Sequence, residues 1–274
     1  MLRRRKSPSQ AKGERPLPRW ARPLDVPECP PGWATGPPDF VGIGAQRSGT
    51  SWWYRGIEAH PSVAAVEGQA KELHYFNRFW KDPPGPEFPE EYHRLFPRPA
   101  GSLAGEWTPR YMLDFWAPML LREAAPAAKL LVMLRDPVER FRSGVERALR
   151  RAPGGEPIDL GRVSDAVARG LYAAQLRRVL EHFAREQILV LQFERCRDEP
   201  LAQLAATWRF LGLEPLAKLP APMLERGPAR EKPELPERWR AELAGRLAGD
   251  VRDLAGMFTE EIDLGLWPNF RGLG

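Results

Sequence analysis

The sequence predicts one α/β domain of the P-loop type, with a central parallel sheet of about five strands flanked by helices. From residue 39 onward, short continuous apolar runs alternate with longer stretches whose apolar residues recur at helical spacing. This alternation is typical of parallel sheets, whose strands are buried on both faces. A glycine-containing stretch, GAQRSGTS, follows the first run and opens the first helical stretch, which is the context of a phosphate-binding loop. With 274 residues, 43% of them hydrophobic, the chain is long enough to build one large core.

The first half of the domain supplies two strands and two helices. FVGIG, residues 40–44, is a buried strand, and TSWWYRGIEAH, residues 50–60, is a helix that stops at Pro61 because proline cannot continue it. SLAGEW, residues 102–107, is a shorter strand, and FWAPMLLREAAP, residues 115–126, is a helix.

The second half opens with the clearest strand, KLLVMLR, residues 129–135, which runs directly into a helix at 136–152. A proline- and glycine-containing loop separates this helix from a long amphipathic helix at 164–187. The remaining elements are a strand at 188–193 and helices at 199–213 and 235–258.

The first 38 residues differ from the rest, so we expect the folded domain to span residues 39–274. Residues 1–38 are rich in proline and arginine and cannot bury enough apolar area to offset the entropy of ordering, which predicts a flexible basic segment. Up to Arg22 this segment holds eight basic residues and one acidic residue, whereas the whole chain carries a net charge of only +5. Residues 23–274 therefore carry a net charge near −2, so the basic excess lies in the first segment, which argues against a nucleic-acid-binding surface on the domain.

Other function classes are disfavoured by what the sequence lacks. No window holds the ~18 uninterrupted apolar residues of a membrane span, and no apolar stretch follows the basic start as in a secretory signal. Two cysteines, Cys29 and Cys196, and four scattered histidines fit neither a disulfide framework nor metal-ligand spacing. We therefore expect a cytoplasmic protein without a metal, and the sequence does not indicate its oligomeric state.

The loop after the first strand is the first candidate anion site. Its amides and the N-terminus of the following helix direct partial positive charge at an anion, and hydroxyl groups lie on the first turn. A nucleotide triphosphatase has lysine directly after the second glycine, but here Thr50 holds that place and Arg47 lies three residues earlier. This departure argues against a P-loop kinase. Asp136 could be taken for a metal-organising aspartate, but Asp-Pro-Val-Glu is typical of a helix N-cap with a reciprocal carboxylate at Glu139.

A second candidate anion site lies at the end of the third strand. Arg135 ends this buried strand at the edge where open α/β sheets bind ligands. Ser143 lies about two helical turns after Asp136 and returns to nearly the same side of the helix. An arginine and a hydroxyl can converge there on one small anion, although a strand-end arginine is often only a surface charge. Together the two sites predict a ligand with two separate phosphate groups.

Four motifs in this order, AQRSGTSW, KELHYF, GEWTPRYM and LRDPVERFRSG, resemble sulfotransferases that use 3′-phosphoadenosine-5′-phosphosulfate (PAPS) and release the bisphosphate PAP. The resemblance is nearest to the branch of heparan sulfate and other glycan sulfotransferases and its bacterial relatives, and it runs from about residue 39 to the C-terminus. It implies a donor without a β/γ-phosphate pair and without a metal.

The resemblance also implies roles for individual residues. The 5′-phosphosulfate loop corresponds to six residues: Gln46, Arg47, Ser48, Gly49, Thr50 and Ser51. The 3′-phosphate pair corresponds to Arg135 and Ser143, and either Arg226 or Arg230 stands in for a basic loop that covers this phosphate. Arg47 replaces a lysine found in many members, and it would act as an electrostatic clamp because it cannot donate its proton.

For catalysis, the resemblance points to Glu72 of KELHYF as the general base, with Lys71 beside it to help hold the phosphosulfate. His74 is the alternative candidate for the general base, because cytosolic phenol-type sulfotransferases use a histidine, from a different segment, in this role. The alternative without a catalytic role is that Lys71 and Glu72 form an exposed ion pair.

The motif GEWTPRYM departs from the family, since Trp107 stands where glycan enzymes commonly have lysine. We expect Trp107 to offer stacking area for a less anionic acceptor. Glu106 and Arg110 are either substrate contacts or an internal salt bridge, and Phe76 and Tyr92 either line the cleft or belong to the core. A hydroxyl or amine acceptor of glycan, tyrosyl, lipid or secondary-metabolite type fits. The alternatives to a sulfotransferase are a P-loop kinase and a PAP-binding protein without catalytic activity.

Overall fold

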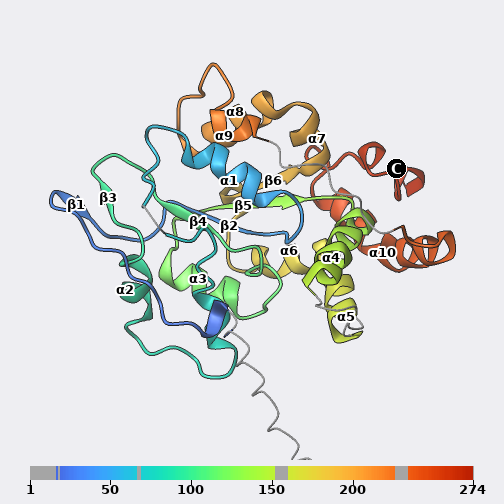
Figure 1. Ribbon diagram of the computed structural model, residues 1–274, viewed down its shortest axis with the longest axis horizontal. Coiled ribbons are helices and arrows are strands. Elements are labelled where there is room, and N and C mark those ends of the chain that lie inside the picture. The colour runs from blue at the N-terminus through green and yellow to red at the C-terminus, as the bar shows by residue number, and fades with distance from the viewer. Residues whose placement is uncertain (1–16, 18, 67–68, 152–159, 226–233, 274) are drawn as a thin grey trace, which may run out of the picture.

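The structure is a computed structural model that describes residues 17, 19–66, 69–151, 160–225 and 234–273. Its centre is a parallel sheet, and in the described residues this sheet has four strands, where about five were predicted: β2 (Phe40–Gly44), β4 (Gly105–Trp107), β5 (Lys129–Leu134) and β6 (Ile188–Gln192). Their order is β4-β2-β5-β6, and each neighbouring pair is parallel. The predicted α/β class is confirmed, and β2 and β5, which precede the two candidate anion sites, are direct neighbours (Figure 1).

Helices cover both faces of this sheet. They are α1 (Thr50–Glu58), α2 (Phe88–His93), α3 (Ala117–Ala124), α4 (Pro137–Arg151), α5 (Leu160–Ala168), α6 (Tyr172–Leu180), α7 (Phe193–Asp198), α8 (Pro200–Leu211), α9 (Ala221–Leu224) and α10 (Glu237–Met257). In Figure 1, α1, α8 and α9 lie on one side of the sheet, and α3 and α6 lie on the other. Alternate residues of β5 point to the two sides, as a strand's two-residue period requires. Val132 packs with the α3–α6–α10 side, and its neighbour Met133 packs with Trp53 and Trp208 on the α1–α8 side.

The prediction of one continuous helix at 164–187 is wrong. The helical stretch is interrupted at Gly170 and Leu171, between the end of α5 and the start of α6. The carboxylate of Asp250 on α10 accepts hydrogen bonds from the amides of Ala173 and Ala174, both at 2.9 Å. Asp250 thus caps the start of α6 from 76 residues away, and no local pattern in the sequence indicates this cap.

Part of the segment before residue 39 is described, and it contacts the domain. Short strands β1 (Trp33–Ala34) and β3 (Arg98–Pro99) form an antiparallel pair. One-turn 3₁₀ helices complete the chain: η1 (Arg19–Ala21), η2 (Phe76–Trp80), η4 (Arg185–Gln187), η5 (Leu264–Leu266) and η6 (Arg271–Leu273). The ring of Trp20 in η1 lies edge-on to Trp80 in η2, with centroids 6.4 Å apart. Residues 1–16 and 18 lie outside the described residues, and the boundary at residue 38 stays a prediction. Among the described helices, none has the length and apolar character that crossing a membrane requires.

Candidate active site

The loop between β2 and α1 has the geometry of an anion cradle. Gly49 adopts φ = 91°, a left-handed conformation that favours glycine. A Cβ at Gly49 would lie 2.7 Å from the ring of Phe193, so no larger residue fits there. Ser48 is completely buried, and its Oγ has no hydrogen-bond partner of ordinary geometry in the described part of the chain. Burial raises the pKa of the neighbouring Tyr172 hydroxyl, and Ser48 partly opposes this rise. A buried hydroxyl without a hydrogen bond of ordinary geometry, placed before a helix N-terminus, can turn toward an anion. Gln46 and Ser51, also predicted here, are exposed on either side of this turn.

Arg135 lies directly after β5, at the same edge of the sheet. Its guanidinium stacks over the ring of Phe193 at 4.8 Å, and its buried Nε has no hydrogen-bond partner among the described residues. Burial lowers the pKa of Arg135, and the nearby carboxylate of Glu194 partly opposes this. Phe193 therefore contacts both the cradle glycine and Arg135, and it joins the two candidate sites.

Arg47 also links the two sites, because it reaches from the loop to α4. Its Nη2 donates to Ser143 Oγ at 2.9 Å and lies 3.7 Å from the carboxylate of Glu146. Its Nε lies 3.2 Å from both the hydroxyl and the carbonyl oxygen of Ser143. Burial, followed by repulsion from Arg147, lowers the pKa of Arg47 to about 10, so the side chain stays protonated at neutral pH. The two predicted anion groups are thus one connected cluster.

Asp136 caps α4, as predicted. Its Oδ1 accepts hydrogen bonds from the amides of Val138 at 2.9 Å and Glu139 at 3.2 Å. The reciprocal contact of a capping box is replaced, because the Asp136 amide donates to Glu194 Oε1 at 3.1 Å, and Glu139 pairs with Arg142 instead. The other carboxylate oxygen of Asp136 accepts two hydrogen bonds from Asn269, which fastens the C-terminal segment to this edge.

The KELHYF motif places three ionisable groups in a row. Glu72 Oε1 lies 3.4 Å from Lys71 Nζ, and Glu72 Oε2 lies 3.2 Å from His74 Nε2. Lys71 also donates to Thr50 Oγ1 of the cradle at 3.1 Å. Glu72 keeps 28% of its side chain exposed, more than Lys71 or His74, so it is the carboxylate that solvent reaches. The row therefore connects an accessible carboxylate to the anion cradle.

The backbone of this motif is held in a clamp of hydrogen bonds to β4 and to the segment that follows it. The amide of Leu73 donates to Glu106, that of His74 to Thr108 and that of Tyr75 to Tyr111, at 3.2, 3.2 and 2.9 Å. His74 is held at φ = 55°, a conformation that costs a residue other than glycine free energy and persists only when its surroundings enforce it. Three consecutive backbone hydrogen bonds provide this enforcement.

Glu106 is the centre of the clamp, and the prediction of a substrate contact or of an ion pair with Arg110 is wrong. It is 1% exposed and accepts four hydrogen bonds, from the Leu73 amide and from the hydroxyls of Thr108, Tyr92 and Tyr111. Burial raises the pKa of its carboxyl, and the hydrogen bonds oppose the rise.

Trp107 does not offer stacking area to an acceptor, because it is completely buried. Its Nε1 donates to the carbonyl of Gly44 at 3.0 Å, and its ring occupies the place of a side chain on Gly42, where a Cβ would lie 2.0 Å away. Phe76 and Tyr92 are likewise core residues.

Sequence reasoning missed two residues behind His74. Asn77 and Asp114 are 2% and 5% exposed, and Asn77 lies 2.7 Å from His74 through Oδ1 and 2.9 Å from Asp114 through Nδ2. Arg110 pairs with Asp114 at 2.9 Å. The three-residue spacing from His74 to Asn77 was the only available signal. Arg226 and Arg230 lie outside the described residues, so their predicted contact with a phosphate stays a prediction.

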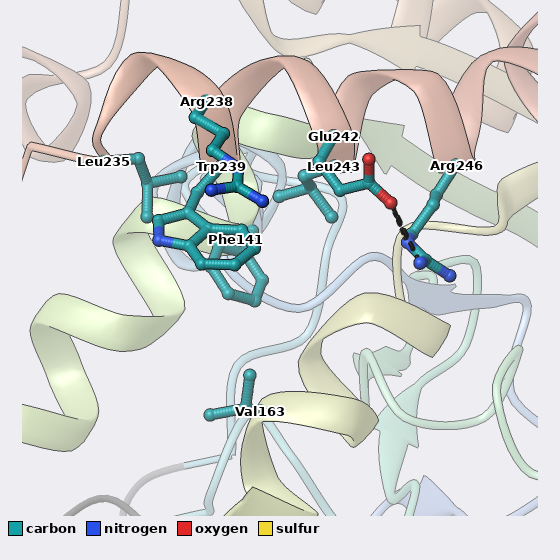
Figure 2. Close-up of a pocket in the computed structure, with 8 residues that line it drawn as sticks. All are labelled: Phe141, Val163, Leu235, Arg238, Trp239, Glu242, Leu243 and Arg246. Carbon is teal, nitrogen blue, oxygen red and sulfur yellow. Dashed lines mark hydrogen bonds and ion pairs between the residues drawn. The ribbon is translucent and has the colours of Figure 1, made fainter.

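A separate groove of about 550 Å³ lies on the far side of α4 from this site. Figure 2 shows Phe141 of α4, Val163 of α5 and Trp239 of α10 around it, with an ion pair between Glu242 and Arg246 on the rim. None of the predicted site residues lines it. Volume alone therefore does not locate the anion site, which is recognised by the glycine turn before α1 and by the arginines that converge on it.

The arrangement can hold two anionic groups at one sheet edge and place a solvent-accessible carboxylate beside them. Within the described residues, no group of three or more histidine, cysteine or acidic side chains has metal-binding geometry. The predicted absence of a metal is a separate expectation, which that observation does not test.

Comparison with known proteins matches residues 37–225 to a family model described as a sulfotransferase domain. Human heparan sulfate glucosamine 3-O-sulfotransferase 3B1 is 30% identical over 189 residues, covering 65% of this chain and 46% of that protein. Mouse heparan sulfate glucosamine 3-O-sulfotransferase 6 is 30% identical over 229 residues, covering 76% of this chain and 64% of that protein. The chain thus spans between about half and two thirds of the length of these two relatives.

Among solved structures, a sulfotransferase from Alicyclobacillus acidocaldarius superposes with a TM-score of 0.64. The two sequences are 24% identical, and the match covers 82% of this chain and 97% of that one. At this identity the likeness supports the fold alone.

Proposed function

The chain belongs to the sulfotransferase family, and we propose that it transfers a sulfuryl group from PAPS to a hydroxyl or amine group of a glycan or glycan-like acceptor. The observation that carries this proposal is the connected anion cluster. A cradle without the kinase lysine is joined through Arg47 to Ser143, with Arg135 on the neighbouring strand. The names of the curated relatives, which are heparan sulfate sulfotransferases, support the acceptor class.

The residues of the cluster have separate roles in holding the donor. PAPS supplies the sulfuryl group and carries one phosphate on each side of its ribose. The amides of the cradle, the Ser48 hydroxyl and the N-terminus of α1 bind the 5′-phosphosulfate, and Arg135 with Ser143 binds the 3′-phosphate. Ser48 Oγ and Arg135 Nε support this fit, because neither makes a hydrogen bond of ordinary geometry within the described residues, and buried polar atoms in native proteins generally make one.

Arg47 stabilises charge on the leaving phosphate. It stays protonated at neutral pH and has more donor hydrogens than its contacts with Ser143 use, so it can serve as a fixed positive charge. Stabilisation of developing charge by a preorganised donor is commonly the largest single contribution to an enzyme's rate.

Glu72 removes the proton from the acceptor. It is the accessible carboxylate beside the cradle, and Lys71 ties it to Thr50. Its exposure to solvent and its link to the cradle through Lys71 support this role.

The test is transfer of radiolabelled sulfur from PAPS to a panel of glycans, with a tyrosyl peptide, a lipid and phenols as further acceptors. We expect a thermal shift with PAP and label in at least one glycan acceptor. A kinase would instead be stabilised by ATP with magnesium and not by PAP. A PAP-dependent shift without transfer to any acceptor would indicate the non-catalytic alternative.

A further inference from the structure

We propose that Asn77 and Asp114 are positioning residues that hold neutral His74 in the tautomer with its hydrogen on Nδ1. Nε2 is then able to take over the proton that Glu72 removes from the acceptor. This inference rests on the proposed function, because it concerns the fate of the acceptor's proton in that reaction. It follows from the direction of four hydrogen bonds that connect Glu72, His74, Asn77, Asp114 and Arg110.

The direction of these hydrogen bonds is set by Asp114, which is buried behind Asn77. One carboxylate oxygen of Asp114, Oδ2, accepts from Arg110 Nε and from Asn77 Nδ2, both at 2.9 Å. A carboxylate offers only acceptors, so the amide group of Asn77 must present its nitrogen to Asp114. Its carbonyl oxygen, Oδ1, then faces His74 Nδ1 at 2.7 Å.

A carbonyl oxygen also only accepts, which fixes the histidine. Nδ1 of His74 must carry a hydrogen and donate it to Asn77 Oδ1. In a neutral ring the other nitrogen, Nε2, then has no hydrogen and presents a lone pair. Nε2 lies 3.2 Å from Glu72 Oε2, so one hydrogen belongs between these two atoms, and with a neutral ring Glu72 supplies it once it has taken up the acceptor's proton. A neutral His74 can therefore accept a proton from Glu72 but cannot donate one to it.

The surroundings leave His74 little freedom to turn. Its side chain is 12% exposed, and its backbone is held at φ = 55° by the hydrogen bond to Thr108. Charged or titratable groups lie at both ends of this row of hydrogen bonds. On one side of His74 are Glu72 and its partner Lys71, and on the other side, behind Asn77, are Asp114 and Arg110. Arg110 balances the charge of Asp114, so what reaches His74 from that side is chiefly the dipole of the Asn77 amide.

The proton then has a defined path. The acceptor's O–H or N–H bond breaks as that atom bonds to sulfur, and the electron pair of the broken sulfur–oxygen bond stays on the donor's phosphate. The proton moves to the Glu72 carboxylate and on to His74 Nε2, which leaves Glu72 ionised next to an imidazolium. Solvent finally takes the proton from the ring. A ring that already carries a hydrogen on both nitrogens cannot take this proton, so turnover falls when the imidazolium form predominates.

The experiment is nitrogen NMR on the full chain with ¹⁵N-labelled histidine, together with kcat as a function of pH. The chain has four histidines, so the signals of His74 are identified by their loss in His74→Gln. In the neutral ring we expect a protonated Nδ1 and an unprotonated Nε2. A protonated Nε2, or a rapid mixture of both forms, would overturn the inference.

Two variants test the positioning residues. In Asp114→Asn the new amide can donate to Asn77 and let it turn, so we expect the Nδ1-protonated form to lose its dominance. We also expect kcat to fall at least ~10-fold, part of the ~10²-fold or more that a general base contributes, while the thermal shift with PAP is retained. In Asn77→Asp a carboxylate faces Nδ1 and favours the imidazolium, so the low-pH decline of kcat should move to higher pH.

Asp165→Asn is the matched control, since it removes an aspartate that also pairs with an arginine four residues away but lies on the surface of α5. It should change neither the histidine spectrum nor kcat. If Asp114→Asn lowers the melting temperature but leaves both unchanged, Asp114 is only structural and the inference is wrong. The same holds if Asn77→Asp folds and its pH profile matches that of the wild type. Failure of the proposed function looks different, because the wild type itself would then transfer no sulfur.

Discussion

The polar groups around Glu72 and those around Arg135 differ in how completely they are hydrogen-bonded within the protein. Glu72, His74, Asn77 and Asp114 form a continuous chain of hydrogen bonds, and the backbone beside them is bonded to the segment after β4. On the other side of the cradle, the buried Nε of Arg135 has no partner among the described residues. Ser48 Oγ, also buried, makes no hydrogen bond of ordinary geometry within the described residues.

This difference separates positioning from binding. A buried polar atom without a partner costs about 1–3 kcal/mol, and that cost is recovered when a ligand supplies the missing hydrogen bond. A bonded network holds its members in one geometry, and in this one the exposed Glu72 carboxylate at its end stays accessible to an acceptor. We therefore expect substitutions on the Glu72 side to act on turnover, and substitutions on the Arg135 side to act on donor affinity.

The largest effect expected is that of Glu72→Gln. The amide cannot take up the acceptor's proton, so kcat should fall on the order of 10²-fold or more, the scale of general-base contributions. The affinity for PAP should stay nearly unchanged, because Glu72 does not belong to the unpaired group. Steady-state kinetics and a PAP titration give the two values. Equal turnover in the variant would remove Glu72 as the base.

Arg135→Ala should show the opposite pattern. Loss of a charge-assisted hydrogen bond to phosphate costs about 1.5–3 kcal/mol, which corresponds to a roughly 10- to 150-fold higher Kd for PAP. Calorimetric titration with PAP measures this change. Arg209→Ala, which removes an exposed arginine of α8, is the matched control for net charge. An Arg135 variant with the Kd of the wild type would contradict the division between binding and positioning.

Glu106→Gln tests the hydrogen-bonded side of the site through the pH dependence of stability. Because burial raises the pKa of the Glu106 carboxyl in the folded state, the folded protein binds this proton more tightly than the unfolded chain does. The contribution of Glu106 to stability is therefore fully present below the unfolded pKa and is lost as the pH rises through the folded one. The free energy of unfolding of the wild type, relative to Glu106→Gln, should decrease from about pH 4 toward neutral pH.

Urea unfolding of both proteins over this range measures the difference, and the exposed Glu181→Gln on the end of α6 serves as the control. A constant difference would show that Glu106 is not held in the buried form that the clamp requires.

The smallest effect is expected for Arg47→Lys. The variant keeps the positive charge and loses part of the forked contact with Ser143, so kcat should change by less than about ten-fold. The PAP affinity should change little as well. A loss of the 10²–10³-fold size seen when a whole transition-state donor is removed would mean that the fork, rather than the charge, is what the site requires.

The sequence alone determined the fold class, the positions of four strands where about five were predicted, the glycine cradle and the placement of Arg135, because these depend on local patterns. A buried strand needs a run of apolar residues, a left-handed turn needs glycine, and a residue at the end of a parallel strand must lie at the ligand-binding edge. The N-cap at Asp136 was predictable for the same reason, since the cap and the amides that it binds are neighbours in the sequence.

Only the tertiary structure decided what each polar residue outside these patterns contacts. Glu106 and Trp107 resemble surface-site residues in sequence, yet they lie in the core, because Tyr92, Tyr111 and the main chain of β2 approach them from distant positions. The pairing of Arg47 with Ser143 spans 96 residues, and the cap of α6 comes from Asp250. A hydrogen bond depends on distance and direction in space, and sequence spacing fixes these only over a few residues of one helix, strand or turn.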